Sequence, residues 1–155
     1  MTNDFQDLYQ DIVMDHNRRP RNYGELQDFT KSSEGFNPLC GDQLTLYVKL
    51  KNGILENISF TGVGCAISKS SASMMTEHIK GKSVAEAIVV FGAFRDMLTD
   101  NVRSDFPTDI LEDLEIFSGV SQFPTRIKCA TLCWHTLNSA LSEQNIVITT
   151  DDNNR

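Results

Sequence analysis

The segment between residues 43 and 61 constrains the fold most, because apolar and polar residues alternate on both sides of a strong turn signal. The apolar residues of its first arm are Leu44, Leu46, Val48 and Leu50. This period of two is typical of a half-buried strand, and Asn52-Gly53 is typical of a tight hairpin turn. The chain then returns through Ile54 to Thr61, with Ile58 and Phe60 on one face. The sequence therefore predicts an antiparallel sheet that begins here.

A short turn directly before this hairpin carries a thiol and a carboxylate two positions apart. Its sequence is Asn37-Pro38-Leu39-Cys40-Gly41-Asp42. The polar segment from Asp28 to Pro38 contains Gly35 and is predicted to be a loop that delivers Cys40 to the first strand. Two groups that can bind a metal would therefore lie together at the edge of the sheet.

Helical patterns surround the hairpin. Apolar residues at three- and four-residue steps predict an opening helix that ends near His16-Asn17, and residues 66–81 are predicted to be a serine-rich helix with Cys65 at its N-terminus. Ser83-Val84-Ala85-Glu86 is a capping box that begins a helix running through Leu98. A polar break follows over 99–107, then a short helix over 109–117 and a last helix after Pro124 that ends before Gln144.

These elements predict one α+β domain over residues 1–148, with a small antiparallel three-stranded sheet packed against several helices. A chain of 155 residues suits a single core. Residues 149–155 are predicted to form a flexible C-terminal tail.

Composition limits the partners and the compartment. Fourteen basic residues against 21 acidic ones give a formal charge of −7, which disfavours nucleic acid and anionic membrane surfaces. No apolar stretch approaches the roughly 18 residues that a bilayer requires, and the N-terminus lacks signal-peptide features. We therefore expect a cytoplasmic protein, in which four cysteines indicate metal binding or reactivity before disulfides.

Four side chains are the candidate metal ligands: Cys40, Asp42, Cys65 and Cys129. Their spacing differs from the paired C-x-x-C of zinc fingers, but each thiol falls at a predicted junction between elements, where backbone ends can converge. Three thiolates and a carboxylate suit tetrahedral Zn²⁺, whereas Ca²⁺ and Mg²⁺ prefer oxygen alone. Arg126 and Lys128 flank Cys129 and either balance the negative charge of the site or form a solvated helix face. Cys133 is interpreted as a buried apolar thiol, with an alternative role beside the metal.

Several motifs in order resemble the SufU branch of the IscU/NifU-N family of iron–sulfur cluster assembly proteins. They are Leu8-Tyr9-Gln10, Asp15-His16, Pro20-Arg21-Asn22, Asn37-Pro38-Leu39-Cys40-Gly41-Asp42, Gly62-Val63-Gly64-Cys65-Ala66-Ile67-Ser68 and Arg126-Ile127-Lys128-Cys129-Ala130-Thr131-Leu132. IscU-type scaffolds carry a histidine immediately before the third cysteine, where this chain has Lys128. The resemblance runs over nearly the whole chain and implies an IscU-like fold.

The resemblance implies a zinc-dependent sulfurtransferase that accepts persulfide sulfur from a PLP-dependent cysteine desulfurase of the SufS type. It places the zinc ligands at Cys40, Asp42, Cys65 and Cys129, makes Cys40 the sulfur acceptor, and gives Arg126 a part in docking or activation. It further implies that a desulfurase histidine replaces Cys40 at the metal, and that downstream iron–sulfur assembly proteins receive the sulfur.

Two other functions stay open. The same thiolates would serve a scaffold that carries a transient iron–sulfur cluster, although the missing histidine counts against it. A structural zinc domain without chemistry is the third interpretation.

Overall fold

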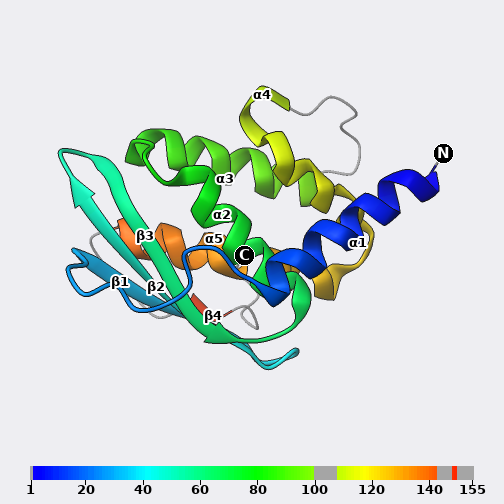
Figure 1. Cartoon of the computed structure of the whole chain (residues 1–155), viewed down its shortest axis with the longest axis horizontal. Coiled ribbons are helices and arrows are strands. Elements are labelled where there is room, and N and C mark those ends of the chain that lie inside the picture. Colours follow the sequence, from blue (N-terminus) through cyan, green and yellow to red (C-terminus); the bar gives the residue numbers. More distant parts are fainter. Residues whose placement is uncertain (1, 100–107, 143–147, 150–155) are drawn as a thin grey trace.

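A computed structural model of the chain describes residues 2–99, 108–142 and 148–149. Its elements follow in the order α1 (Thr2–Arg18), β1 (Lys31–Asn37), β2 (Asp42–Lys51), β3 (Ile54–Val63), α2 (Ala66–Ile79), α3 (Val84–Thr99), α4 (Thr108–Leu111), the 3-10 helix η1 (Glu112–Gln122), α5 (Pro124–Leu141) and β4 (Ile148–Thr149) (Figure 1). None of the described helices is long and apolar enough to cross a membrane.

The sheet has the strand order β3-β2-β1-β4. Strands β1, β2 and β3 are antiparallel, which confirms the predicted α+β class with a three-stranded antiparallel sheet. The two-residue strand β4 adds a short parallel partner to β1. Thr149, the first residue of the predicted tail, lies in β4, and residues 150–155 lie outside the described part of the chain.

Strand β1 contradicts the loop predicted over residues 28–38. Lys31–Asn37 pairs with β2 along its whole length, from Lys31 opposite Val48 to Asn37 opposite Asp42. Its buried positions carry Ser33, Gly35 and Asn37 in place of apolar side chains, so the period of two was hidden. A Cβ atom on Gly35 would collide with the Thr136 side chain, which shows how closely α5 lies over this strand.

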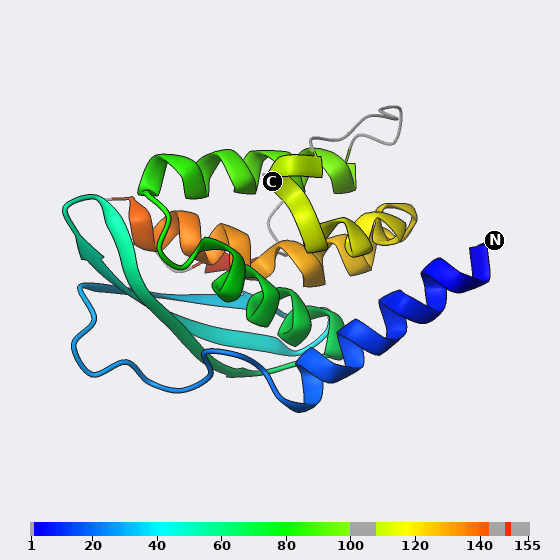
Figure 2. The same cartoon turned by 45° about the horizontal axis from the view of Figure 1, so that its top comes forward.

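The helices lie on one side of the sheet (Figure 2). Helices α2 and α5 contact the strands, and α3 and η1 pack against α5 as a further layer. Helix α1 contacts α2 and η1, and its N-terminal end extends away from the body in both views. Leu46, Val48, Phe94 and Trp134 are fully buried between these layers. This packing brings the end of β1 close to the starts of β2, α2 and α5.

The predicted helix starts are confirmed. Cys65 is the N-cap of α2, where its sulfur accepts a hydrogen bond from the Ser68 N–H. The capping box at α3 is formed in both directions: the Ser83 N–H donates to Glu86 Oε1 at 2.9 Å, and the Glu86 N–H donates to Ser83 Oγ at 3.1 Å. Residues 100–107 of the predicted polar break lie outside the described residues.

The predicted helix over 109–117 is wrong in kind, because the chain forms α4 and then η1. Glu112, the first residue of η1, has a left-handed backbone conformation with φ of +49°, which interrupts the helix between α4 and η1. Leu111, Leu114, Phe117 and Val120 are buried at intervals of three residues. A 3-10 helix has three residues per turn, so this winding places all four on the core-facing side.

Candidate metal centre

The turn between β1 and β2 forms the outer wall of the site. Asn37 and Asp42 are the last paired residues of the two strands, and residues 38–41 close the hairpin. The Cys40 N–H donates to the Asn37 carbonyl at 3.2 Å, and Gly41 has φ of +72°, a conformation that favours glycine. Cys40 is therefore exposed at the tip, while Asp42 is buried at the start of β2 with 2% exposure.

Cys129 meets this turn from the second turn of α5. Its sulfur lies 3.1 Å from Cys40 Sγ, although the two residues are 89 positions apart in the chain. The ligand atoms of Cys40, Asp42 and Cys129 all lie within 4.8 Å of one another. The structure thus brings together three of the four predicted ligands.

Cys65 borders the same cluster from the start of α2. Its sulfur lies 3.9 Å from Asp42 Oδ2, and its backbone N–H donates to Asp42 Oδ1 at 2.8 Å. The side chain is half-buried. The fourth predicted ligand therefore lies beside the other three, at a helix N-terminus where a thiolate is favoured.

The donor set fits a tetrahedral metal that accepts sulfur. Sulfur atoms about 2.3 Å from a tetrahedral zinc ion lie about 3.8 Å apart. The sulfurs of Cys40 and Cys129 lie 3.1 Å apart, and the ligand atoms of Cys40, Asp42 and Cys129 all lie within 4.8 Å of one another. Three thiols and one carboxylate suit Zn²⁺ and exclude the oxygen-binding ions Ca²⁺ and Mg²⁺. The arrangement can hold zinc after small side-chain movements.

The two inner thiols titrate very differently. A hydrogen bond from Cys129 and a second from the Ser68 N–H lower the pKa of Cys65 to about 7, although burial opposes this. The hydrogen bond to Cys65, together with burial, raises the pKa of Cys129. Of these two thiols, Cys65 therefore has the lower pKa.

Cys133 takes no part in the cluster. Burial raises the pKa of its thiol to about 12, so the side chain is neutral at physiological pH. Its sulfur lies 3.5 Å from Ser71 Oγ, between α2 and α5. This agrees with the interpretation of Cys133 as a small buried apolar residue.

Two residues that support the site were missed in the sequence. The Asn37 amide donates to Asp42 Oδ2 at 3.1 Å and to Cys129 Sγ at 3.4 Å. Gly64 lies against Asp42, and a Cβ atom there would come within 2.5 Å of Oδ1. The sequence offers a polar residue immediately before Pro38 and a glycine immediately before Cys65, but neither residue type by itself predicts a contact with a metal ligand.

Exposed apolar side chains lie close to the candidate ligands along the chain. Leu39 and Val63 are 63% and 69% exposed, and the Arg126 guanidinium lies 4.5 Å from the ring centre of the exposed Phe123. Arg126 is therefore an accessible cation on the first turn of α5.

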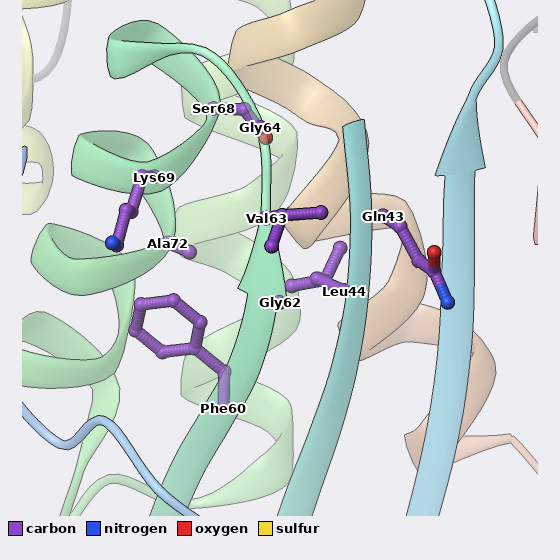
Figure 3. A pocket seen from close by; sticks show the side chains of 9 residues that line it. All are labelled: Gln43, Leu44, Phe60, Gly62, Val63, Gly64, Ser68, Lys69 and Ala72. Carbon is purple, nitrogen blue, oxygen red and sulfur yellow. The ribbon is translucent and has the colours of Figure 1, made fainter. Parts of the chain in front are cut away.

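A very small cavity lies near the site. It has a volume of about 10 Å³ and lies between β2, β3 and the N-terminal half of α2, where Gly64 and Ser68 line it (Figure 3). It has room for about one water molecule. An open groove of about 540 Å³ runs beside α1, lined in part by Tyr9, Ile67 and Arg126. The small cavity cannot hold an organic substrate, whereas the Cys40 side chain is exposed.

Comparison with known proteins places these features in context. Residues 8–130 match the family described as NifU-like N terminal domain. The chain is 43% identical over 137 residues to the zinc-dependent sulfurtransferase SufU of Bacillus subtilis (strain 168), covering 88% of this chain and 91% of that protein. It is 40% identical over 134 residues to the iron-sulfur cluster assembly scaffold protein IscU of Streptococcus pyogenes serotype M1, covering 86% and 82%.

A solved structure agrees with these sequence matches. The crystal structure of FiSufU from Fervidobacterium islandicum, described as an iron-sulfur cluster assembly scaffold protein for the SUF system, superposes with a TM-score of 0.79 at 33% identity. The match covers 84% of this chain and 94% of FiSufU.

Proposed function

The chain belongs to the NifU-like N terminal domain family, and from this premise we propose that it is a zinc-dependent sulfurtransferase of iron–sulfur cluster assembly. The observation that carries the proposal is the asymmetry of the cluster. One thiol, Cys40, is exposed at a hairpin tip, while Asp42 and Cys129 are almost completely buried beside it. Such an arrangement suits one reactive thiol and a set of residues that stay in place.

Cys40, Asp42, Cys65 and Cys129 would hold the zinc ion. When bound, zinc keeps its thiol ligands deprotonated at neutral pH. Two charge-related features of the chain support this set. The Cys65 thiol already has a pKa of about 7 in the protein alone, and Arg126 and Lys128 lie within three residues of Cys129.

In the proposed transfer, the Cys40 thiolate attacks the outer sulfur of a persulfide on the donor protein. A new S–S bond forms at Cys40 Sγ, the S–S bond of the donor breaks, and the donor cysteine leaves as a thiolate. The outer sulfur atom passes from the donor cysteine to Cys40, and one thiolate replaces another, so no external oxidant or reductant is needed. Cys40 then carries the persulfide to an acceptor in cluster assembly.

Cys40 is best placed for this step because of its position on the turn. Exposure lets a donor persulfide reach its sulfur, and the hairpin tip can move more freely than the strands and helices that hold the other ligands. A sulfur donor carried on the surface of another protein can therefore reach it.

We propose a PLP-dependent cysteine desulfurase of the SufS type as that donor, in the cytoplasm. The exposed Leu39, next to Cys40 in the chain, and the exposed Val63, at the end of β3, support docking of a protein surface. Arg126 supplies an accessible positive charge for docking or activation. Downstream iron–sulfur assembly proteins would receive the sulfur.

Removal of the Cys40 thiol tests the mechanism. A desulfurase with free cysteine is assayed for sulfide release in the presence of the parent chain, Cys40→Ala or Cys133→Ala. We expect stimulation by the parent and by Cys133→Ala, which removes a buried thiol away from the cluster, and none by Cys40→Ala. Equal stimulation by Cys40→Ala would reject transfer through Cys40 and leave that residue a structural role.

A scaffold for iron–sulfur clusters is the second candidate, because a relative that is 40% identical is named as a scaffold. Metal analysis of protein purified without added metal separates the two. Near-stoichiometric zinc agrees with the transferase. An intrinsic iron–sulfur chromophore with little zinc would replace the transferase by the scaffold.

A further inference from the structure

The Asn37 side chain is buried in a way that costs free energy. Asn37 is fully buried at the end of β1, and its carbonyl oxygen Oδ1 makes no hydrogen bond to any part of the chain that the structure describes. Buried polar atoms are nearly always paired, so an unpaired one at a cluster of reactive groups points to a role other than stability. An apolar side chain of similar size would fill the same position without this cost.

The other half of the amide shows what that role is. Nδ2 has two N–H groups, and it donates to Asp42 Oδ2 at 3.1 Å and to Cys129 Sγ at 3.4 Å. A carboxylate and a metal-bound thiolate only accept hydrogen bonds, so with metal bound the NH₂ group faces both of them and Oδ1 points away. Bonds of this kind strengthen when the acceptor is ionised, as both acceptors are when they bind a metal.

The Asn37 amide contacts two of the four candidate ligands, Asp42 and Cys129, and both of these are buried. Both N–H groups of Asn37 are used by Asp42 and Cys129, which leaves none for the sulfur of Cys40. Asp42 is held further by the Cys65 N–H on Oδ1 and by Gly64 against the same oxygen. Cys40 is tied to Asn37 only through the backbone of the turn.

We propose that Asn37 is a positioning residue that keeps Asp42 and Cys129 on the metal while Cys40 leaves it. The inference rests on the proposed function, since it assumes a zinc ion that is held while one ligand departs. Asn37 acts through the two ligands and does not itself touch the metal or the transferred sulfur.

The test measures zinc retention by the full chain as it competes with a chelator of known affinity. The variants are Asn37→Leu and the smaller Asn37→Ala, each made in the parent and in Cys40→Ala. Ser33→Ala is the matched control, because Ser33 is also buried on β1 but bonds Ser139 Oγ at 3.0 Å, away from the cluster. Far-UV circular dichroism verifies the fold of each variant.

We expect both Asn37 variants to lower zinc affinity about 10- to 100-fold, the usual effect of losing a hydrogen-bond partner of a metal ligand. The loss should be undiminished in the Cys40→Ala background, because Asn37 acts on the ligands that remain. In cobalt-substituted protein, the sulfur-to-metal charge-transfer band should move to longer wavelength, since the lost N–H bond no longer stabilises the Cys129 sulfur. Ser33→Ala should change neither quantity.

Three results would overturn the inference. Zinc affinity of the Asn37 variants equal to that of Ser33→Ala would remove the positioning role. An effect that disappears in the Cys40→Ala background would show that Asn37 acts through the leaving ligand. A parent chain that binds no zinc would reject the proposed function as well, whereas the first two results leave that function intact.

Discussion

Replacement of Gly64 by alanine tests the placement of Asp42 directly. A Cβ atom at residue 64 would lie 2.5 Å from Asp42 Oδ1 and 3.2 Å from Asp42 Cα. Ordinary van der Waals contact begins at 3.4 Å, so the carboxylate has to move by nearly 1 Å. Such a movement breaks the 2.8 Å hydrogen bond from the Cys65 N–H to Oδ1.

The cost follows from these contacts. Overpacking costs about 1–3 kcal/mol and a lost hydrogen bond to a charged group about 1.5–3 kcal/mol. Movement of the Asp42 carboxylate loses the hydrogen bond and relieves only part of the overpacking, because the added Cβ atom still lies 3.2 Å from Asp42 Cα. We therefore expect Gly64→Ala to lower the free energy of unfolding by about 2–4 kcal/mol. For a chain of this length that corresponds to a thermal midpoint lower by about 5–15 °C. Zinc affinity should fall as well, because a candidate ligand has moved.

Gly92→Ala is the matched control. Gly92 lies within α3, and an added Cβ atom there would meet nothing within 4 Å. Because alanine favours helix over glycine, this variant should keep or raise the midpoint, with a free energy of unfolding higher by up to about 1 kcal/mol. The measurements are differential scanning calorimetry and chelator competition. If Gly64→Ala has the midpoint and zinc affinity of the parent, the close approach of Asp42 to Gly64 is wrong, and with it the buried position assigned to the carboxylate.

Two further predictions concern the scaffold. Ser83→Ala removes the N-cap of α3 and should lower the free energy of unfolding by about 1 kcal/mol, which a urea titration measures; an unchanged midpoint would contradict the capping box with Glu86. Hydrogen bonds from Arg21 and Arg19 lower the pKa of Asp15 to about 2 in the folded protein. The carboxylate therefore stabilises the fold above about pH 4, where it is ionised in both the folded and the unfolded chain. This stabilisation is lost as the pH falls towards 2. Asp15→Asn should therefore unfold at a lower temperature than the parent at pH 7, and the gap should close between about pH 4 and pH 2; a gap independent of pH would contradict these ion pairs.

Local sequence determined the parts of the fold in which neighbours along the chain supply the interaction. Alternation around Asn52-Gly53 correctly predicted β2 and β3, since both the turn and the buried face are encoded within about 20 residues. The capping box at Ser83 could also be predicted from the sequence, because its two hydrogen bonds join residues that are three positions apart. The ligand candidates could be named for a similar reason: a thiol or a carboxylate binds metal wherever it lies.

Only the tertiary structure decided the rest. Strand β1 has no apolar period because α5 lies so close that serine, glycine and asparagine fill the buried side. The winding of η1 depends on the core that its buried residues face, since intervals of three and four residues look alike in a short sequence.

The site shows the same division. Cys40 and Cys129 meet at 3.1 Å across 89 residues of chain, and no local pattern encodes that distance. Asn37 became interpretable only when its amide was seen between Asp42 and Cys129, with its carbonyl oxygen unpaired. The sequence by itself determined which groups can bind a metal, because that is a property of the side chain. Packing decided which of them are buried and which is exposed, because burial and hydrogen bonds arise only when distant segments meet.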